Sequence, residues 1–228
     1  MKKIILVAAI SLATFYAKAQ INKGSVMVGI GLSSAKADPT PISNANGTSS
    51  SFDQKVFATT GSIGLAIKEN MVVGLNFNHS YANLLQSDGF SVQKRNIVVT
   101  GGSIFLRKYL RTIKDLYLFA EGNVGYSNAK DSAWSSGNDG AKATQNKVSF
   151  SVFPGVCYML NGKFIFELAI TDLVGINYTN QKTTYAYSST AQTVNSFNLT
   201  TSVTGTNSLM FGFKFLFGNK ARSSKEKS

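Results

Sequence analysis

An alternation of apolar with small or polar residues at every second position is the feature that most restricts how this chain can fold. It is clearest near the end of the sequence, in LMFGFKFLFG. There Leu209 and the phenylalanines at 211, 213, 215 and 217 alternate with Met210, Gly212, Lys214 and Leu216. Successive side chains of a β-strand point to opposite faces, so this pattern predicts a strand with one strongly apolar face.

Eight segments of the chain carry the same alternation, and together they predict an all-β protein. One face of each segment collects Val, Ile, Leu and Phe, while the other collects mainly Gly, Ser, Asn, Ala and Thr. The segments are SVMVGIGLS (25–33), GSIGLAI (61–67), MVVGLNFNHSY (71–81), GSIFLRKYL (102–110), LYLFAEGNVGY (116–126), VSFSVFPGVCYML (148–160), FIFELAITD (164–172) and LMFGFKFLFG (209–218).

The connections between these segments alternate between short and long, which is typical of an up-and-down antiparallel sheet. Short connections span 68–70, 111–115 and 161–163, and long polar ones span about 33–54, 84–93, 127–147 and 178–206. If each short connection is a turn, apolar residues face each other across it. The predicted pairs are Ile67 with Met71, Leu65 with Val73, Leu110 with Leu116, Leu106 with Ala120, Leu160 with Phe164, and Tyr158 with Phe166.

The composition of the two faces predicts which one points inward. Eight antiparallel strands close into a barrel whose interior only side chains fill, and small polar residues suit that interior. A soluble barrel would need a charged outer face, but charged residues are only 15% of the chain. We therefore predict an eight-stranded antiparallel transmembrane β-barrel whose apolar face meets lipid. A soluble lipocalin-like carrier with its apolar face inward is the alternative.

The two ends of the sequence predict export and a basic tail. A basic start, an apolar run at 4–16 and an Ala-x-Ala site are typical of a signal peptide cut after Ala19. We therefore expect a signal peptide at 1–19, a barrel domain at 20–218 and a basic periplasmic tail at 219–228. The formal charge of +12 favours attraction to anionic lipid headgroups over nucleic acid, since no nucleic-acid-binding motif is present.

Four stretches of the sequence, in this order, resemble the eight-stranded outer-membrane barrels of the OmpX/OmpA-like family. They are IFLRKYL, LYLFAEGNVGY, PGVCYML with GKFIFELA, and FGFKFLF. The resemblance implies an outer-membrane location in a Gram-negative bacterium, long loops outside the cell and both termini in the periplasm. It also implies that the assembly machinery recognises the aromatic residue that ends the last strand. Phe217 resembles that residue, although the chain continues beyond it.

Four ionisable residues fall on the inward face of the predicted barrel: Arg107, Glu121, Glu167 and Lys214. Buried charges persist only when they are paired, so we predict ion pairs of Arg107 with Glu121 and of Glu167 with Lys214. The predicted register places Arg107 opposite Phe119, with Glu121 as its diagonal neighbour. The four residues predict a static network that fills the lumen, or alternatively a gate that lets ions through by exchanging partners.

We expect no catalytic, cofactor or metal site. The single histidine, His79, precedes Ser80 on a predicted strand, so the two side chains point to opposite faces; Asp172 is predicted to share the level of His79. Cys157 is the only cysteine, so no internal disulfide forms. The loops are the better candidates for binding, through Trp134 or through the edge of strands that project beyond the membrane.

These observations predict a monomeric outer-membrane barrel with a structural or surface-interaction role and no catalysis. Its expected partners are outer-membrane lipid, the assembly machinery and an extracellular protein that binds the loops. A narrow pore for ions or small solutes is the alternative. A lipid-modifying outer-membrane enzyme is a third and weaker interpretation.

Overall fold

The computed structural model describes residues 21–37, 42–43, 49–87, 92–113, 115–135, 138–170, 173–185, 191–201 and 209–218. The predicted signal peptide and basic tail, and Asp172, lie outside these ranges. The described part of the chain contains no helix long and apolar enough to cross a membrane.

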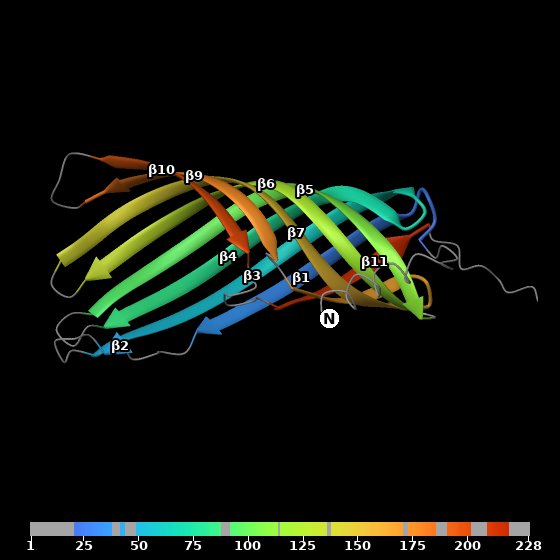
Figure 1. Cartoon of the computed structure of the whole chain (residues 1–228), viewed down its shortest axis with the longest axis horizontal. Coiled ribbons are helices and arrows are strands. Elements are labelled where there is room, and N and C mark those ends of the chain that lie inside the picture. Colours follow the sequence, from blue (N-terminus) through green and yellow to red (C-terminus); the bar gives the residue numbers. More distant parts are fainter. Residues whose placement is uncertain are drawn as a thin grey trace, which may run out of the picture.

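The described residues form one antiparallel, up-and-down sheet that closes into a ring of eight strand positions, which confirms the predicted fold class. The strands are β1 Val26–Ala37, β2 Ile42–Ser43, β3 Ser49–Lys68, β4 Met71–Ser87, β5 Val92–Ile113, β6 Leu116–Ser135, β7 Asn138–Leu160, β8 Phe164–Ile170, β9 Val174–Thr184, β10 Gln192–Thr201 and β11 Leu209–Phe217. They run obliquely to the long axis, with the short turns gathered at one end (Figure 1).

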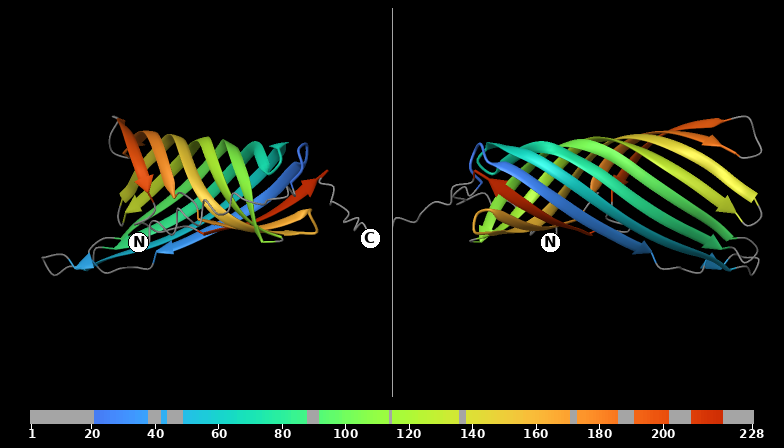
Figure 2. Two further views of the ribbon diagram at one scale, coloured as in Figure 1. Left: turned by 45° about the vertical axis from the view of Figure 1, so that its right-hand side comes forward. Right: turned by 180° about the vertical axis from the view of Figure 1, so that it is seen from behind.

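The ring closes where β1 meets β11. Their register runs from Val26 opposite Phe217 to Ser34 opposite Leu209, and β11 also pairs with β8 (Figure 2). The seventh and eighth predicted strands are each divided in two, β8 with β9 and β10 with β11. At the far end β9 pairs with β7 and β10, but no described strand pairs with the other edge of β10.

The predicted register is confirmed at one short turn and corrected at the other two. Leu160 lies opposite Phe164 and Tyr158 opposite Phe166, with positive φ at Asn161 and Gly162 in the turn between them. At the first turn Leu65 does lie opposite Val73, but Lys68 rather than Ile67 pairs with Met71.

The connection at 111–115 is shorter than predicted. Strand β5 continues to Ile113, and an irregularity between Arg111 and Ile113 shifts the register. Leu110 therefore lies opposite Leu118, not Leu116, and Leu106 opposite Gly122, not Ala120. The same shift places Arg107 directly opposite Glu121 instead of Phe119.

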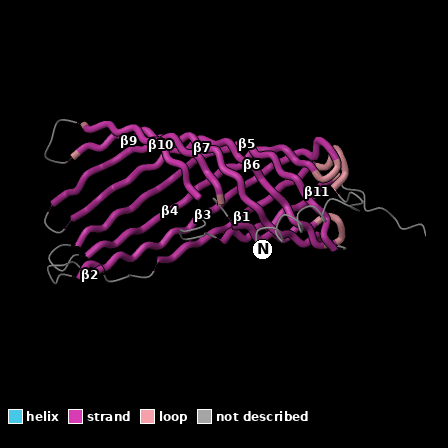
Figure 3. The backbone as a smooth tube through the Cα atoms, viewed as in Figure 1, coloured by secondary structure: helices cyan, strands magenta, loops and turns pink. Residues whose placement is uncertain are grey.

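The apolar face of the sheet, whose strands form the wall of the barrel in Figure 3, points outward along the whole ring. Phe211 is 63% exposed, whereas Glu121 and Glu167 are 2% and 5% exposed. A soluble barrel would show the reverse, because burial of apolar surface is what stabilises a protein in water. The exposed apolar side chains are numerous on every long strand, so the outer surface suits hydrocarbon rather than water.

Replacement of Phe211 by lysine tests the solvent that this outer face meets. Phe211 lies on β11 between the apolar residues 209 and 213. We expect Phe211→Lys to lower the free energy of unfolding in lipid vesicles by about 2–4 kcal/mol, because the lysine has to lie near the bilayer midplane. Thr193→Lys, at an exposed polar position of β10, is the matched control and should change it little. Equal effects of the two substitutions would contradict a lipid-facing surface.

Candidate functional site

The lumen is crossed by a chain of ion pairs formed by Arg107, Glu121, Glu167 and Lys214. Arg107 Nε donates to Glu121 Oε2 at 2.5 Å, and its Nη2 also contacts that oxygen. Arg107 Nη1 donates to Glu167 Oε2 at 2.5 Å. Lys214 Nζ lies 3.2 Å from Glu167 Oε1 as an ion contact without the geometry of a hydrogen bond. The four residues carry no net charge.

The structure brings together both pairs that the sequence indicated and adds a contact across the lumen. Arg107 is on β5 and Glu167 on β8, which is separated from β5 by β6 and β7. The order of strands in the sheet does not predict the contact between Arg107 and Glu167, because this contact joins opposite walls of the barrel. It links the two pairs into one network that holds both walls.

Aromatic rings surround the guanidinium of Arg107, and sequence reasoning missed them. The Arg107 Cζ atom lies 4.2 Å from the centroid of the Phe119 ring and 5.7 Å from that of Tyr109. Arg107 Nη1 also donates to the Tyr109 hydroxyl at 3.2 Å, and that hydroxyl contacts Met27 Sδ at 3.3 Å. Cation–π and hydrogen-bond contacts fix the guanidinium where water is excluded. The period-two alternation of the sequence did place Phe105, Tyr109 and Phe119 on the inward face, and this was the signal from which their contact with Arg107 could have been predicted.

Polar side chains complete the network on the side of the long strand extensions. Asn76 Nδ2 donates to Glu121 Oε1 at 3.3 Å and to Asn123 Oδ1 at 3.1 Å. Lys214 Nζ donates to Ser62 Oγ at 3.1 Å. A buried charge is tolerated only when partners replace its hydration, and each of the four has such partners here.

Below the network, tightly packed apolar side chains close the end of the barrel that carries the short turns. The residues before β1 contribute to this closure, because Ile21 is fully buried and its backbone exchanges hydrogen bonds with Asn70. The fully buried side chains of this layer are Met27, Val72, Tyr117, Cys157, Met159, Ile165 and Leu216. Cys157 is a free thiol that packs as a small apolar residue.

A further ion pair lies near the far ends of β5 and β6, away from the short turns. Arg95 Nε donates to Asp131 Oδ1 at 3.4 Å, and Nη2 contacts Asp131 Oδ2. The hydrogen bond to this carboxylate raises the pKa of Arg95 above its ordinary value. This pair is partly exposed and contributes less to stability than the buried network.

The other residues that the sequence singled out form no catalytic arrangement in the described part of the chain. The His79 ring is exposed on β4, with Nδ1 3.2 Å from Thr100 Oγ1, and Ser80 points to the opposite face. The described residues contain no group of three or more potential metal ligands. Trp134 lies in β6, but its side chain is outside the described part. Phe217 ends β11 and is 52% exposed.

Gly155 makes room for the ring that covers Arg107. A Cβ atom at Gly155 would lie 2.2 Å from Phe119 Cζ and 2.8 Å from the Leu168 carbonyl oxygen. We expect Gly155→Ala to destabilise the barrel by about 1–3 kcal/mol, because the added methyl group overpacks the lumen. A Cβ at Gly122 meets nothing within 4 Å, so Gly122→Ala is the control. The check is the temperature at which each folded form is lost in detergent, and equal temperatures would disprove the tight packing.

No protein-family model and no curated protein sequence matches the chain. The crystal structure of the outer membrane protein OprG from Pseudomonas aeruginosa is similar, with a TM-score of 0.51 and 14% identity over 88% of this chain and 99% of OprG. The outer membrane protease OmpT from Escherichia coli has a TM-score of 0.40, with 11% identity over 90% of this chain and all of OmpT. That score is too low to support a shared topology. The match to OprG shows a shared fold, that of an outer-membrane β-barrel, and the OmpX/OmpA-like family is not specifically confirmed.

Proposed function

We propose that this protein is a monomeric outer-membrane barrel of a Gram-negative bacterium that conducts no solutes and acts as a structural and surface-interaction protein. A signal peptide at 1–19 directs its export, and the assembly machinery recognises Phe217. The observation that carries the proposal is the buried, charge-neutral network in the lumen. Its outer-membrane setting is supported by the lipid-like outer surface and by the fold shared with OprG.

The burial of all four charges supports a closed lumen. Arg107 is 1% exposed, and Lys214, the most weakly contacted of the four, is 4% exposed. An ion that passed through the lumen would have to break these ion pairs. Breaking them costs free energy, because the separated side chains are buried and water does not replace their partners. The narrow-pore alternative requires such a separation. The network therefore favours a plug over a gate.

Removal of one carboxylate from the plug tests this part of the proposal. We expect Glu121→Ala to lower the free energy of unfolding by about 3–5 kcal/mol, because Arg107 remains buried with one of its two carboxylate partners missing. We also expect no steady single-channel current from either protein in planar bilayers. Asp53→Ala is the control, since Asp53 forms a partly exposed pair with Lys55 at 3.6 Å worth about 1 kcal/mol or less. Large steady currents through the unmodified barrel would establish the pore instead.

The surface role rests on the β9–β10 hairpin, at the end of the sheet away from the short turns. The β9–β10 hairpin continues for about ten pairs, and one edge of β10 has no partner among the described strands. An edge of this kind binds an extended peptide by adding a strand. We propose that an extracellular protein binds there or at the adjoining loops.

The proposed role includes no catalysis, and a direct assay tests this. His79 has a threonine hydroxyl as its neighbour, and the adjacent Ser80 points to the opposite face. The reconstituted barrel should hydrolyse neither phospholipid vesicles nor an unfolded protein substrate. Hydrolysis that disappears in His79→Ala would instead identify an enzyme.

A further inference from the structure

Three successive rows of residues run across the outward face of β3 to β7. Residues of one row lie opposite each other from strand to strand, and the rows are two residues apart on each strand. The aliphatic row is Ile63, Leu75, Ile104 and Val124, and the aromatic Phe150 continues it on β7. The aromatic row is Gly61, Phe77, Gly102, Tyr126 and Val148. The polar row is Thr59, His79, Thr100, Asn128 and Asn146.

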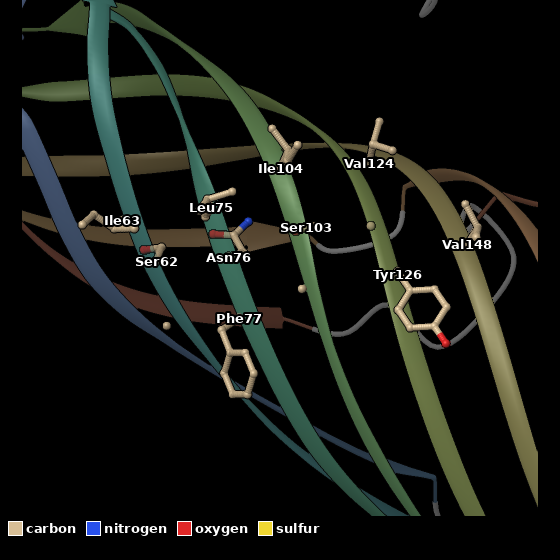
Figure 4. A pocket seen from close by; sticks show the side chains of 13 residues that line it. Ser62, Ile63, Leu75, Asn76, Phe77, Ser103, Ile104, Val124, Tyr126 and Val148 are labelled. Carbon is tan, nitrogen blue, oxygen red and sulfur yellow. The ribbon is translucent and has the colours of Figure 1, made fainter.

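A hollow of about 730 Å³ lies over the aliphatic and aromatic rows. It exists because glycines at 61 and 102 alternate with Phe77 and Tyr126, so that two positions of the aromatic row carry no side chain. Figure 4 shows the rings of Phe77 and Tyr126 turned away from the row of aliphatic side chains, with the gap between them. The hollow is therefore open, apolar and on the face that meets lipid.

The polar row borders this hollow on the side of the long strand extensions and is organised by hydrogen bonds. His79 Nδ1 lies 3.2 Å from Thr100 Oγ1. The Tyr126 hydroxyl and Asn128 Nδ2 each donate to Asn146 Oδ1 at 2.8 Å. Polar groups on a lipid-facing wall are unfavourable in hydrocarbon. Beside the hollow, this row offers hydrogen-bonding groups that suit the polar parts of a lipid.

Beyond the polar row the charged outward side chains are mostly basic, and they lie among exposed aromatic ones such as Phe57 and Tyr81. On the described parts of β3 to β7 four exposed lysines lie there, and the carboxylate of Asp53 contacts only Lys55, at 3.6 Å. Lys130 is closest to the hollow, four residues past Tyr126 on β6, or about 9 Å along the barrel axis for a strand tilted near 45°. The four lysines are Lys55, Lys94, Lys130 and Lys142.

We propose that the outer wall over β3 to β7 binds one anionic lipid. Its acyl chain fills the hollow between Phe77 and Tyr126, its polar groups lie against His79 and Thr100, and its negative charge lies near Lys130. Along the barrel axis, the outer wall presents first the apolar hollow, then the neutral polar row and then the lysines. An anionic lipid has its acyl chain, polar linkage and charged headgroup in the same order. This inference rests on the proposal that the barrel spans a membrane.

Filling the hollow tests the acyl-chain part of the site. A Cβ atom at Gly61 meets nothing within 4 Å, so Gly61→Leu adds a lipid-facing side chain without disturbing the sheet. Gly122 faces outward on β6, lies outside the hollow and also has free space at its Cβ, so Gly122→Leu is the matched control. The measurement is native mass spectrometry of the detergent-solubilised full chain titrated with dioleoyl phosphatidylglycerol. We expect Gly61→Leu to weaken binding about tenfold, as for the loss of two buried methylene groups, and Gly122→Leu to leave it unchanged.

Removal of one lysine tests the headgroup part. We expect Lys130→Gln to weaken binding of phosphatidylglycerol about fivefold, as for one cation near a charged lipid surface, with no change for dioleoyl phosphatidylcholine. Lys163→Gln, in the turn at the opposite end of the barrel, is the control and should have no effect.

The outcomes separate this inference from the proposed function. Every variant is first run unboiled and boiled on a detergent gel, and a mobility shift on heating shows that it forms a closed barrel. If the unmodified protein shows no shift, the membrane barrel itself is wrong. If it shifts but Gly61→Leu and Gly122→Leu bind the lipid equally, the hollow is not a lipid site. The mass spectra of the unmodified protein could instead show mainly dimers, and Gly61→Leu could make the protein monomeric. That result would assign the hollow to a second copy of the chain and overturn the inference.

Discussion

The pairing of β1 with β11 is the constraint on which the rest of the structure depends. Nine residue pairs, from Val26 with Phe217 to Ser34 with Leu209, turn an open sheet into a ring. Hydrocarbon offers no hydrogen bonds to a free strand edge, so only a closed sheet can expose so much apolar surface to lipid. Closure also creates two distinct environments, a narrow interior and an outer wall. The same strands supply both, since successive side chains alternate between them.

The interior environment explains why ionic residues are tolerated in a wall that is otherwise apolar or small. Two cations and two carboxylates from four strands meet at one level, and Phe119 and Tyr109 enclose the guanidinium of Arg107. Their balance leaves no net charge to hydrate, and their contacts join opposite walls. Stability and the proposed impermeability therefore have the same physical origin, because the interactions that hold the walls together also fill the space between them.

The outer wall is organised as finely as the interior. Register places aliphatic, aromatic and polar residues in parallel rows, and the two glycines of the aromatic row leave the hollow beside Phe77 and Tyr126. An exposed glycine in a strand weakens it, so the two glycines of this row lower the stability of their strands. The far ends of the strands differ from this wall. There β10 is held along one edge by β9, and no described strand pairs with its other edge.

Much of this architecture is determined by local sequence. Period-two alternation identifies the faces of every long strand, and the turn around Gly162 sets its register because Asn161 and Gly162 both adopt positive φ. Alternation also places Arg107, Glu121, Glu167 and Lys214 on the inner face. It does not predict the irregularity near Arg111, which moves Arg107 opposite Glu121, because one added residue in a strand leaves no mark in composition. Only the closed tertiary structure decides that Arg107 reaches Glu167, that two strands are divided, and that glycines on separate strands share a hollow. Each of these depends on how strands distant in sequence curve around a common axis.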